Sequence, residues 1–257
     1  MCQFKSAIVL KNRIVCPLDL DSHTDILESI NMKDDNEFPN FVRIEMIPKD
    51  GDIFNHNLNN WVLKVDQDFI PEWFDEDKTE KQMREIYMPE VFEKRFIIDR
   101  EVDEITEGRW FMKNGILNKL AGSATIQRVC DSATIQRVCD SATVQDVYDS
   151  AIIQFVFDSA TIQRVFDSAT IQNVYGSAII QRVCDSATIQ DVFDSATIQN
   201  VYGSATIQNV YGSATVQRVC DSATVQELKG RAIYRKIQYW GKSKLYVPKD
   251  AYEIIEV

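Results

Sequence analysis

Two residues near the start of the chain could together hydrolyse an amide. Removal of Met1 would expose Cys2 as an N-terminal nucleophile whose own amine serves as the base, the arrangement of N-terminal nucleophile hydrolases. His23 could assist the thiol, and Asp21 or Asp25 could hold the imidazole. Those hydrolases need a larger domain, and this segment has no glycine-rich loop to hold an oxyanion. We therefore prefer a buried cysteine and a histidine at a helix start, and keep Cys2 with His23 as the catalytic alternative.

Acidic residues later in the same region could bind a hard cation. Asp66, Asp68 and Glu72 are followed by three consecutive acids at 75–77, and carboxylate oxygens are the ligands that such cations prefer. The segment lacks the fixed ligand spacing and the turn glycine of a calcium loop. We expect a solvated acidic loop here, and we predict no metal site and no cofactor.

A nine-residue repeat fills the middle of the chain. Residues 123–230 are twelve consecutive units with the consensus Ser, Ala, Thr, Ile, Gln, variable, Val, aromatic or Cys, and Asp or Gly. Gln stands at place five in every unit, and places four and seven are always aliphatic. Degenerate units at 114–122 and 231–239 keep the apolar places, as capping repeats do. Both histidines, His23 and His56, lie outside this array, so it offers no histidine for catalysis.

The length and composition of the unit predict a parallel β-solenoid, also called a β-helix. Helical repeats need about 30 residues or more, and the unit is rich in β-branched and aromatic residues. Nine residues are too few to circle a core, so we expect two units, or 18 residues, in each coil. Places two, four and seven should point inward, with a bend at place five or six. Fourteen units would give seven coils.

Stacking of alternate units predicts regular columns of side chains. The Gln side chains should form an amide ladder, and place nine should adopt a left-handed backbone in a turn capped by the following Ser. We name the two columns at place nine the odd edge (Asp131, Asp149, Asp167, Asp185, Gly203 and Asp221) and the even edge (Asp140, Asp158, Gly176, Asp194, Gly212 and Gly230). The aspartates of the odd edge are the candidate binding residues. Cys130, Cys139, Cys184 and Cys220 should lie too far apart for disulfides.

Residues 1–104 have the composition of a small α+β domain. We expect a hairpin from strands at 4–10 and 13–15, a helix at 22–32 with a Ser or Asp cap, and strands at 41–47 and 61–65. An amphipathic helix should span 78–95, with Pro89 as a point where it could break. The solenoid is assigned to 105–239. A C-terminal β cap is assigned to 240–257, with strands around 233–240 and 252–257.

Several pieces of the N-terminal domain carry a resemblance. The segments MCQFKSAIVLKNR, DSHTDILESI, FVRIEMIPKDGD and WVLKVDQDFIPEWF, followed by repeats of the SAT type, resemble a largely uncharacterised family of gut-bacterial and phage proteins. In that family a similar α+β domain precedes short-period β-solenoid repeats. The resemblance implies a bacterial or phage-infected cell as the setting, and it supplies no catalytic residue.

Charge and targeting signals narrow the class of partner. A net charge of −11 argues against direct nucleic-acid binding, because phosphate binders present Lys and Arg. The first residues have no cleavage site of a signal peptide, and no apolar run reaches the roughly 20 residues of a membrane helix. We therefore expect a cytoplasmic protein without a membrane partner.

These features favour a non-enzymatic binding or scaffold protein that contacts another protein through an acidic surface. A DNA mimic that inhibits a DNA-binding or defence enzyme is a further alternative, although the twelve repeats carry only 11 acidic and 6 basic residues. Aromatic residues at place eight should be exposed and could pair two copies of the chain. These are Tyr148, Phe157, Phe166, Tyr175, Phe193, Tyr202 and Tyr211.

Overall fold

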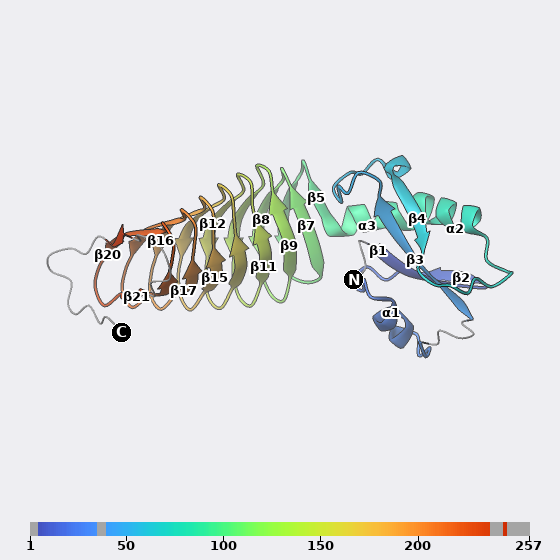
Figure 1. Cartoon of the computed structure of the whole chain (residues 1–257), viewed down its shortest axis with the longest axis horizontal. Coiled ribbons are helices and arrows are strands. Elements are labelled where there is room, and N and C mark those ends of the chain that lie inside the picture. Colours follow the sequence, from blue (N-terminus) through green and yellow to red (C-terminus); the bar gives the residue numbers. More distant parts are fainter. Residues whose placement is uncertain (1–4, 35–39, 237–243, 246–257) are drawn as a thin grey trace. The chain divides into compact units, whose positions relative to one another are not determined.

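The chain divides after Phe96 into two units, drawn from blue to turquoise and from green to red in Figure 1. The computed structural model describes residues 5–34, 40–236 and 244–245. Cys2 and most of the predicted C-terminal cap, including the strand at 252–257, lie outside the described residues. None of the described helices is long and apolar enough to cross a membrane.

A four-stranded antiparallel sheet, in the order β2-β1-β3-β4, is the frame of the first unit. Its strands are β1 (Lys5–Leu10), β2 (Arg13–Val15), β3 (Phe41–Pro48) and β4 (Trp61–Val65). The helical segments are α1 (His23–Ser29), the 3-10 turn η1 (Leu58–Asn60), α2 (Glu76–Gln82), the π-helical η2 (Met83–Tyr87) and α3 (Met88–Arg95). The predicted α+β domain, its hairpin and its strands are therefore present.

Helix α1 begins and packs as its sequence predicts. The side chain of Ser22 caps the helix by accepting the backbone N–H of Asp25 at 3.4 Å. Ile26 and Leu27 are fully buried in a cluster with Ile8 of β1, which places α1 on one face of the sheet. This packing positions His23, the first residue of the helix.

The long helix before the solenoid continues through Pro89. Residues 83–87 form a π-helical turn, in which the N–H of Met88 bonds to the carbonyl of Met83. Because proline has no N–H and crowds the carbonyl four residues before it, a wider turn upstream lets the helix continue. The expected break at Pro89 is thus a local widening, and α3 continues to Arg95.

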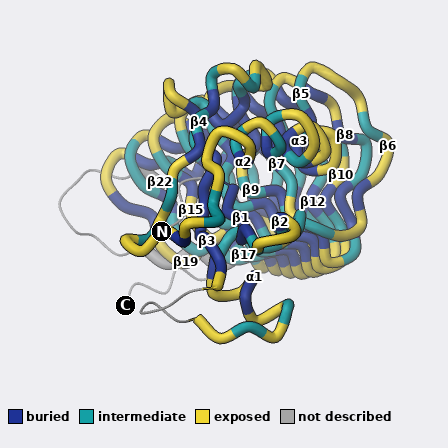
Figure 2. Tube along the Cα trace, turned by 90° about the vertical axis from the view of Figure 1, so that its right-hand side faces the viewer, coloured by how far each residue is buried: buried dark blue, intermediate teal, exposed yellow. Residues whose placement is uncertain are grey.

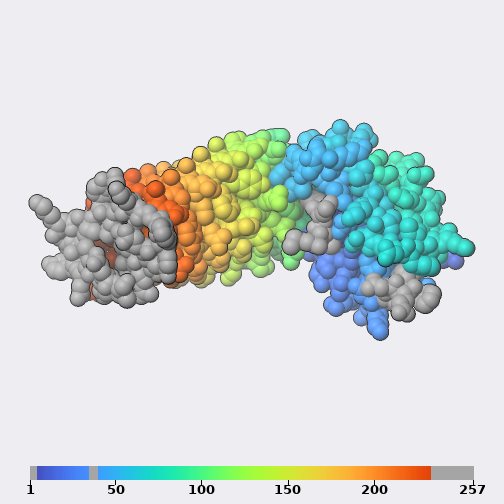
Figure 3. Space-filling model, in the orientation of Figure 1, coloured from blue at the N-terminus to red at the C-terminus, as the bar shows by residue number. Residues whose placement is uncertain are grey.

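Two parallel nine-stranded sheets form the solenoid, one from the odd-numbered and one from the even-numbered strands. The strands are β5 (Phe96–Ile98), β6 (Glu101–Ile105), β7 (Arg109–Lys113), β8 (Ile116–Leu120), β9 (Thr125–Cys130), β10 (Thr134–Val138), β11 (Thr143–Val147), β12 (Ile152–Val156), β13 (Thr161–Val165), β14 (Thr170–Val174), β15 (Ile179–Val183), β16 (Thr188–Val192), β17 (Thr197–Val201), β18 (Thr206–Val210), β19 (Thr215–Val219), β20 (Thr224–Leu228), β21 (Ile233–Lys236) and β22 (Lys244–Leu245). In Figure 3 the successive coils follow one another in sequence order.

The register of the strands confirms a coil of two repeats. Val129 of β9 pairs with Val147 of β11, and Val138 of β10 pairs with Val156 of β12, each 18 residues later. Val129 pairs across its sheet with place seven of the next odd unit, so each place of the repeat forms a column. The β-solenoid fold predicted from the repeat is present, with parallel strands and the predicted period.

The interior of the solenoid is built from places two, four and seven. Ala124, Ile126 and Val129 of the first unit are fully buried, and the same places remain buried along the array. Figure 2 shows these buried stretches between exposed turns. Burial of three apolar side chains per unit is the main force that holds successive coils together.

The solenoid begins earlier than the repeat pattern indicates. β6 pairs in parallel with β8, and the division between the units follows Phe96, whereas the sequence assignment placed it after residue 104. Residues 96–113 lack the SAT consensus but supply the three-residue β5 and the five-residue β6 and β7, and β6 and β7 pair in parallel with later strands. The repeat consensus is therefore sufficient for a coil but is not required at the N-terminal end.

Candidate functional site

Place nine holds the turns at both edges of the solenoid. Its eight aspartates all have a left-handed backbone, with φ between 52° and 59°, and its four glycines have φ between 64° and 78°. Aspartate tolerates this conformation better than most residues with a Cβ, and glycine adopts it without a steric cost. The restriction of place nine to Asp or Gly thus follows from the backbone, as predicted.

A hydrogen bond between neighbouring coils stabilises these turns. The N–H of Asp131 donates to Oδ2 of Asp149 at 3.2 Å, and the N–H of Asp149 donates to Oδ2 of Asp167 at 3.3 Å. The backbone N–H of Ser150 donates in turn to the carbonyl of Asp131 at 3.1 Å. The expected serine cap is replaced here by the carboxylate of the next coil.

The odd edge carries four aspartates on consecutive coils. Lys113 lies 3.7 Å from Asp131, while Asp149, Asp167 and Asp185 are exposed and have no ion-pair partner among the described residues. On the even edge, Gly176 separates Asp158 from Asp194. The odd edge is therefore the longer uninterrupted row of negative charge.

One ion pair joins two charged side chains on the sheet of odd-numbered strands. Arg164 and Asp146, at the variable place of adjacent odd coils, form a two-pronged pair at 2.5 and 2.7 Å. The guanidinium of Arg164 also lies over the ring of Phe166, 5.6 Å from its centroid. This arginine is therefore already paired along the face.

The aromatic residues of the even units form a continuous stack. We define the aromatic stack as Phe157, Tyr175, Phe193 and Tyr211, whose neighbouring ring centroids are 4.8 to 5.3 Å apart with interplanar angles of 6° to 14°. The predicted exposure of the place-eight aromatics is wrong, because all seven are half-buried. Stacking between coils covers one ring with the next, which lowers the area available for pairing two chains.

The predicted amide ladder of Gln side chains is absent among the described residues. Strands pair on both sides of Gln, as at Thr170 to Thr188 and Asn173 to Asp191, but the Gln place falls out of the register. Asn200 donates instead to the backbone carbonyl of Gln181 at 3.0 Å. The bend expected at this place redirects the amides, so the backbone carbonyl and not the side chain becomes the acceptor.

The four cysteines of the repeats are free thiols, as predicted. Burial, reinforced by the charge of Asp131, raises the pKa of the Cys130 thiol to about 12. Burial also raises the pKa of Cys139 and Cys184. Since the thiolate is the nucleophile, these cysteines are poorly reactive at neutral pH.

His23 lies in the first unit and contacts neither aspartate that the sequence suggested. Asp21 accepts both guanidinium N–H groups of Arg95, at 2.9 and 3.1 Å, and also pairs with Lys5 at 3.0 Å. Asp25 lies in the first turn of α1 and donates its backbone N–H to the Ser22 cap. The expectation that Asp21 or Asp25 holds the imidazole is wrong. Asp21 is paired with the buried cations Lys5 and Arg95, and Asp25 lies in the first turn of α1 and does not contact the imidazole.

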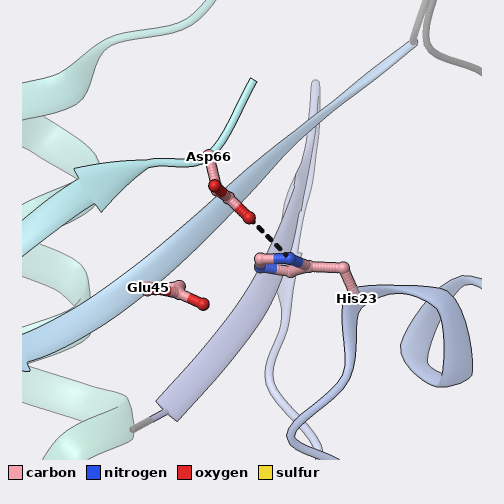
Figure 4. Close-up of side chains that lie close together, drawn as sticks. All are labelled: His23, Glu45 and Asp66. Carbon is pink, nitrogen blue, oxygen red and sulfur yellow. Dashed lines mark ion pairs between the residues drawn. The ribbon is translucent and has the colours of Figure 1, made fainter. Parts of the chain in front are cut away.

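Asp66 is the acid that meets His23. Nδ1 of the imidazole lies 3.5 Å from Oδ2 of Asp66 (Figure 4). Nε2 lies 3.0 Å from the carbonyl oxygen of Ile44. Glu45 completes the group, with ligand atoms of all three side chains within 4.8 Å of one another. We name His23, Glu45 and Asp66 the His23 cluster.

The sequence reasoning missed Glu45, although one signal was available. Glu45 lies in the middle of the apolar strand FVRIEMIP, at a position that is 97% buried and is surrounded in sequence by aliphatic residues. A charged residue within such a strand indicates a specific partner, since an unpaired charge is rarely buried. The other acids of the predicted cation segment, Asp68 and Glu72, are exposed and do not join the cluster.

The fold and these side-chain columns define the class of protein: a nonapeptide-repeat β-solenoid preceded by an α+β unit. The chain matches no protein-family model, no curated protein and no solved structure. The class therefore rests on the repeat, the strand register and the geometry of the two units.

Proposed function

We propose that this protein is a non-enzymatic β-solenoid scaffold that binds another protein through the odd edge. The observation that carries the proposal is the run of aspartates on four consecutive coils, three of which are exposed and have no described ion-pair partner. Parallel strands place such neighbours about 4.8 Å apart. The bacterial or phage-infected cytoplasm implied by the resemblance is the proposed setting.

Fixed carboxylates make this edge suited to a basic partner surface. Each of Asp131 and Asp149 has its Cβ held by a left-handed turn, and Asp149 and Asp167 each use Oδ2 to bond the preceding coil. The second oxygen of each carboxylate is left for a ligand. Neighbouring carboxylates at this spacing repel by roughly 1 kcal/mol in water, and a cationic partner would relieve that repulsion.

The test is capture of a partner from a bacterial lysate, followed by its binding to three purified forms of the full chain. The first variant combines Asp149→Asn, Asp167→Asn and Asp185→Asn, which keeps an oxygen acceptor for each coil-to-coil bond while removing three charges. The matched control makes the same change at Asp140, Asp158 and Asp194 on the even edge. Unchanged circular dichroism would establish that both variants fold.

We expect the odd-edge variant to lose at least about tenfold in affinity, and the even-edge control to bind as the wild type does. Binding should also weaken as salt is raised, because exposed charges are screened. Equal affinity of the odd-edge variant and the wild type would reject the odd edge as the binding surface. Amide hydrolysis that disappears in Cys2→Ala would instead support the catalytic alternative.

A further inference from the structure

We infer that the His23 cluster binds a divalent transition-metal ion of the zinc class, with one imidazole nitrogen and two carboxylate oxygens as ligands. This site lies in the first unit, in residues His23, Glu45 and Asp66, and it is independent of the proposed binding edge. Three side-chain ligands with a fourth position open to solvent are a common arrangement for zinc.

The backbone fixes which nitrogen of His23 is available. A carbonyl oxygen can only accept a hydrogen bond, so the contact of Nε2 with the Ile44 carbonyl at 3.0 Å requires the proton on Nε2. In the neutral imidazole, Nδ1 then presents a lone pair toward Oδ2 of Asp66. Metal-binding histidines are typically oriented in this way, with the second ring N–H donating to a carbonyl or carboxylate.

Glu45 is the observation that points to a ligand. The residue is only 3% exposed, and none of the described residues is hydrogen-bonded or ion-paired to its carboxylate. Figure 4 shows its carboxylate directed toward the imidazole of His23. A buried carboxylate without a partner is unfavourable, and a cation between the three side chains would remove that cost.

Among the residues that the structure describes, the nearby cations do not neutralise Glu45. Arg43, on the same face of β3, pairs with Asp34 and lies over the ring of Phe41. Lys64 stands directly opposite Glu45 on β4, but its side chain is exposed and no ion pair joins the two residues. No Lys or Arg within the described ranges therefore pairs with Glu45, which leaves its charge available to an added cation.

The donor types select the class of metal, and the separation of His23 and Asp66 fits it. Two ligands of a tetrahedral zinc ion lie roughly 3.3 Å apart, given zinc–ligand bonds of about 2.0 Å, and the His23–Asp66 separation is 3.5 Å. An imidazole ligand favours zinc, copper, nickel or iron, whereas calcium and magnesium take oxygen ligands. Asp66 is 49% exposed, so an ion can reach the cluster from solvent.

The experiment uses the chelator-treated full chain, titrated with Zn²⁺ by calorimetry and with Co²⁺ by absorption spectroscopy. We expect one saturable site and a rise in the melting temperature with Zn²⁺. His23→Gln and Glu45→Gln should each weaken binding by at least about tenfold. His56→Gln, which removes the other and exposed histidine, and Asp68→Asn, which removes a nearby exposed acid, are the matched controls and should bind as the wild type does.

A second measurement keeps the inference falsifiable if a variant binds weakly because it folds poorly. Without metal, Glu45→Gln should melt at or above the wild-type temperature, because it removes an unpaired buried charge, and Zn²⁺ should no longer raise it. If Zn²⁺ causes no shift in the wild type, or if Glu45→Gln lowers the metal-free melting temperature, the inference fails. A sulfur-to-cobalt charge-transfer band would also overturn it, because that band would place the ion at a cysteine, and the His23 cluster contains none.

Discussion

Asp149 accepts the backbone N–H of Asp131 from the preceding coil of the solenoid, at 3.2 Å. The donor residue has a left-handed backbone, with φ of 56°. A turn in this conformation leaves an N–H without a partner inside its own coil, and the carboxylate 18 residues later satisfies it. The repeat thus uses one residue type both to make a turn and to tie that turn to its neighbour.

Replacement of Asp149 should separate these two roles. Asp149→Ala removes the acceptor and also places a residue less tolerant of the left-handed region at φ of 59°, so we expect a loss of about 1–2 kcal/mol. Asp149→Asn keeps an oxygen acceptor and should lose less than about 0.5 kcal/mol. Urea unfolding followed by circular dichroism measures both. Equal losses for the two variants would show that the carboxylate oxygen does not stabilise the turn.

The Asp21 ion pairs should be essential to the first unit. Asp21→Ala would leave Lys5 and Arg95, which are 0% and 2% exposed, without their shared carboxylate. Breaking a buried pair by removing one partner costs about 3–5 kcal/mol, so we expect a much lower unfolding midpoint for this unit. The control is Asp19→Ala, an exposed acid two residues away, with an expected change below about 0.5 kcal/mol. Similar stability of the two variants would contradict the role assigned to Asp21.

A substitution toward the repeat consensus should be harmful at Gly115. Place two is Ala in all twelve repeats, but a Cβ at Gly115 would lie 2.6 Å from Cγ2 of Ile97 and 2.8 Å from the carbonyl oxygen of Arg100. We expect Gly115→Ala to destabilise the solenoid by about 1–3 kcal/mol, as overpacking does. Thermal unfolding of this variant against the wild type is the measurement. A higher melting temperature would mean that the first coil can move away from residue 115.

The aromatic stack should show energetic coupling between neighbouring coils. In a double-mutant cycle of Tyr175→Leu and Phe193→Leu, we expect a coupling of about 0.5–1.5 kcal/mol, because the rings lie 4.8 Å apart. Phe166 and Tyr202 occupy the odd column with Cys184 between them, so the same cycle on that pair should give a coupling near zero. Coupling of equal size in both cycles would assign the effect to general packing.

The cysteine thiols should make stability fall at high pH. The pKa of Cys130 is raised from 9.0 to about 12, chiefly by burial, so the unfolded chain releases this proton first as pH rises. Stability linked to this thiol is fully present below pH 9 and is lost as pH rises toward 12. At pH 8 the thiolate fraction should be about a thousandfold lower than in the unfolded chain. Alkylation of Cys130 should therefore be far slower in the folded protein than in urea, and similar rates would contradict its burial.

The repeat alone predicts most of the second unit. A nine-residue period with apolar places two, four and seven allows few structures, because each coil repeats the same local choice and stacks on an identical one. The left-handed turn at Asp131 followed in the same way from the restriction of place nine to Asp or Gly. The sequence could not place β5 and β6, since they carry no consensus and their positions in the sheets depend on pairing with later strands.

The direction in which side chains point within each column could be established only from the structure. The Gln residues occupy one column, but the bend at their place turns the amides out of line, whereas the rings of Tyr175 and Phe193 meet nearly parallel at 6°. Both columns have the same spacing along the chain. Local backbone geometry, which the repeat pattern does not report, decided that the rings stack and that the amides do not.

The sequence by itself determined the solenoid, its 18-residue coil, its edge columns and the separation of its thiols, because these follow from a short period that every unit repeats. Only the tertiary structure decided which acid meets His23 and which cation meets Asp21. Asp66 lies beyond two further strands, and Arg95 is 74 residues from Asp21, so strand order and helix packing bring them together. Contacts between distant, unrepeated segments leave no period in the sequence, and for that reason the His23 cluster emerged only from the fold.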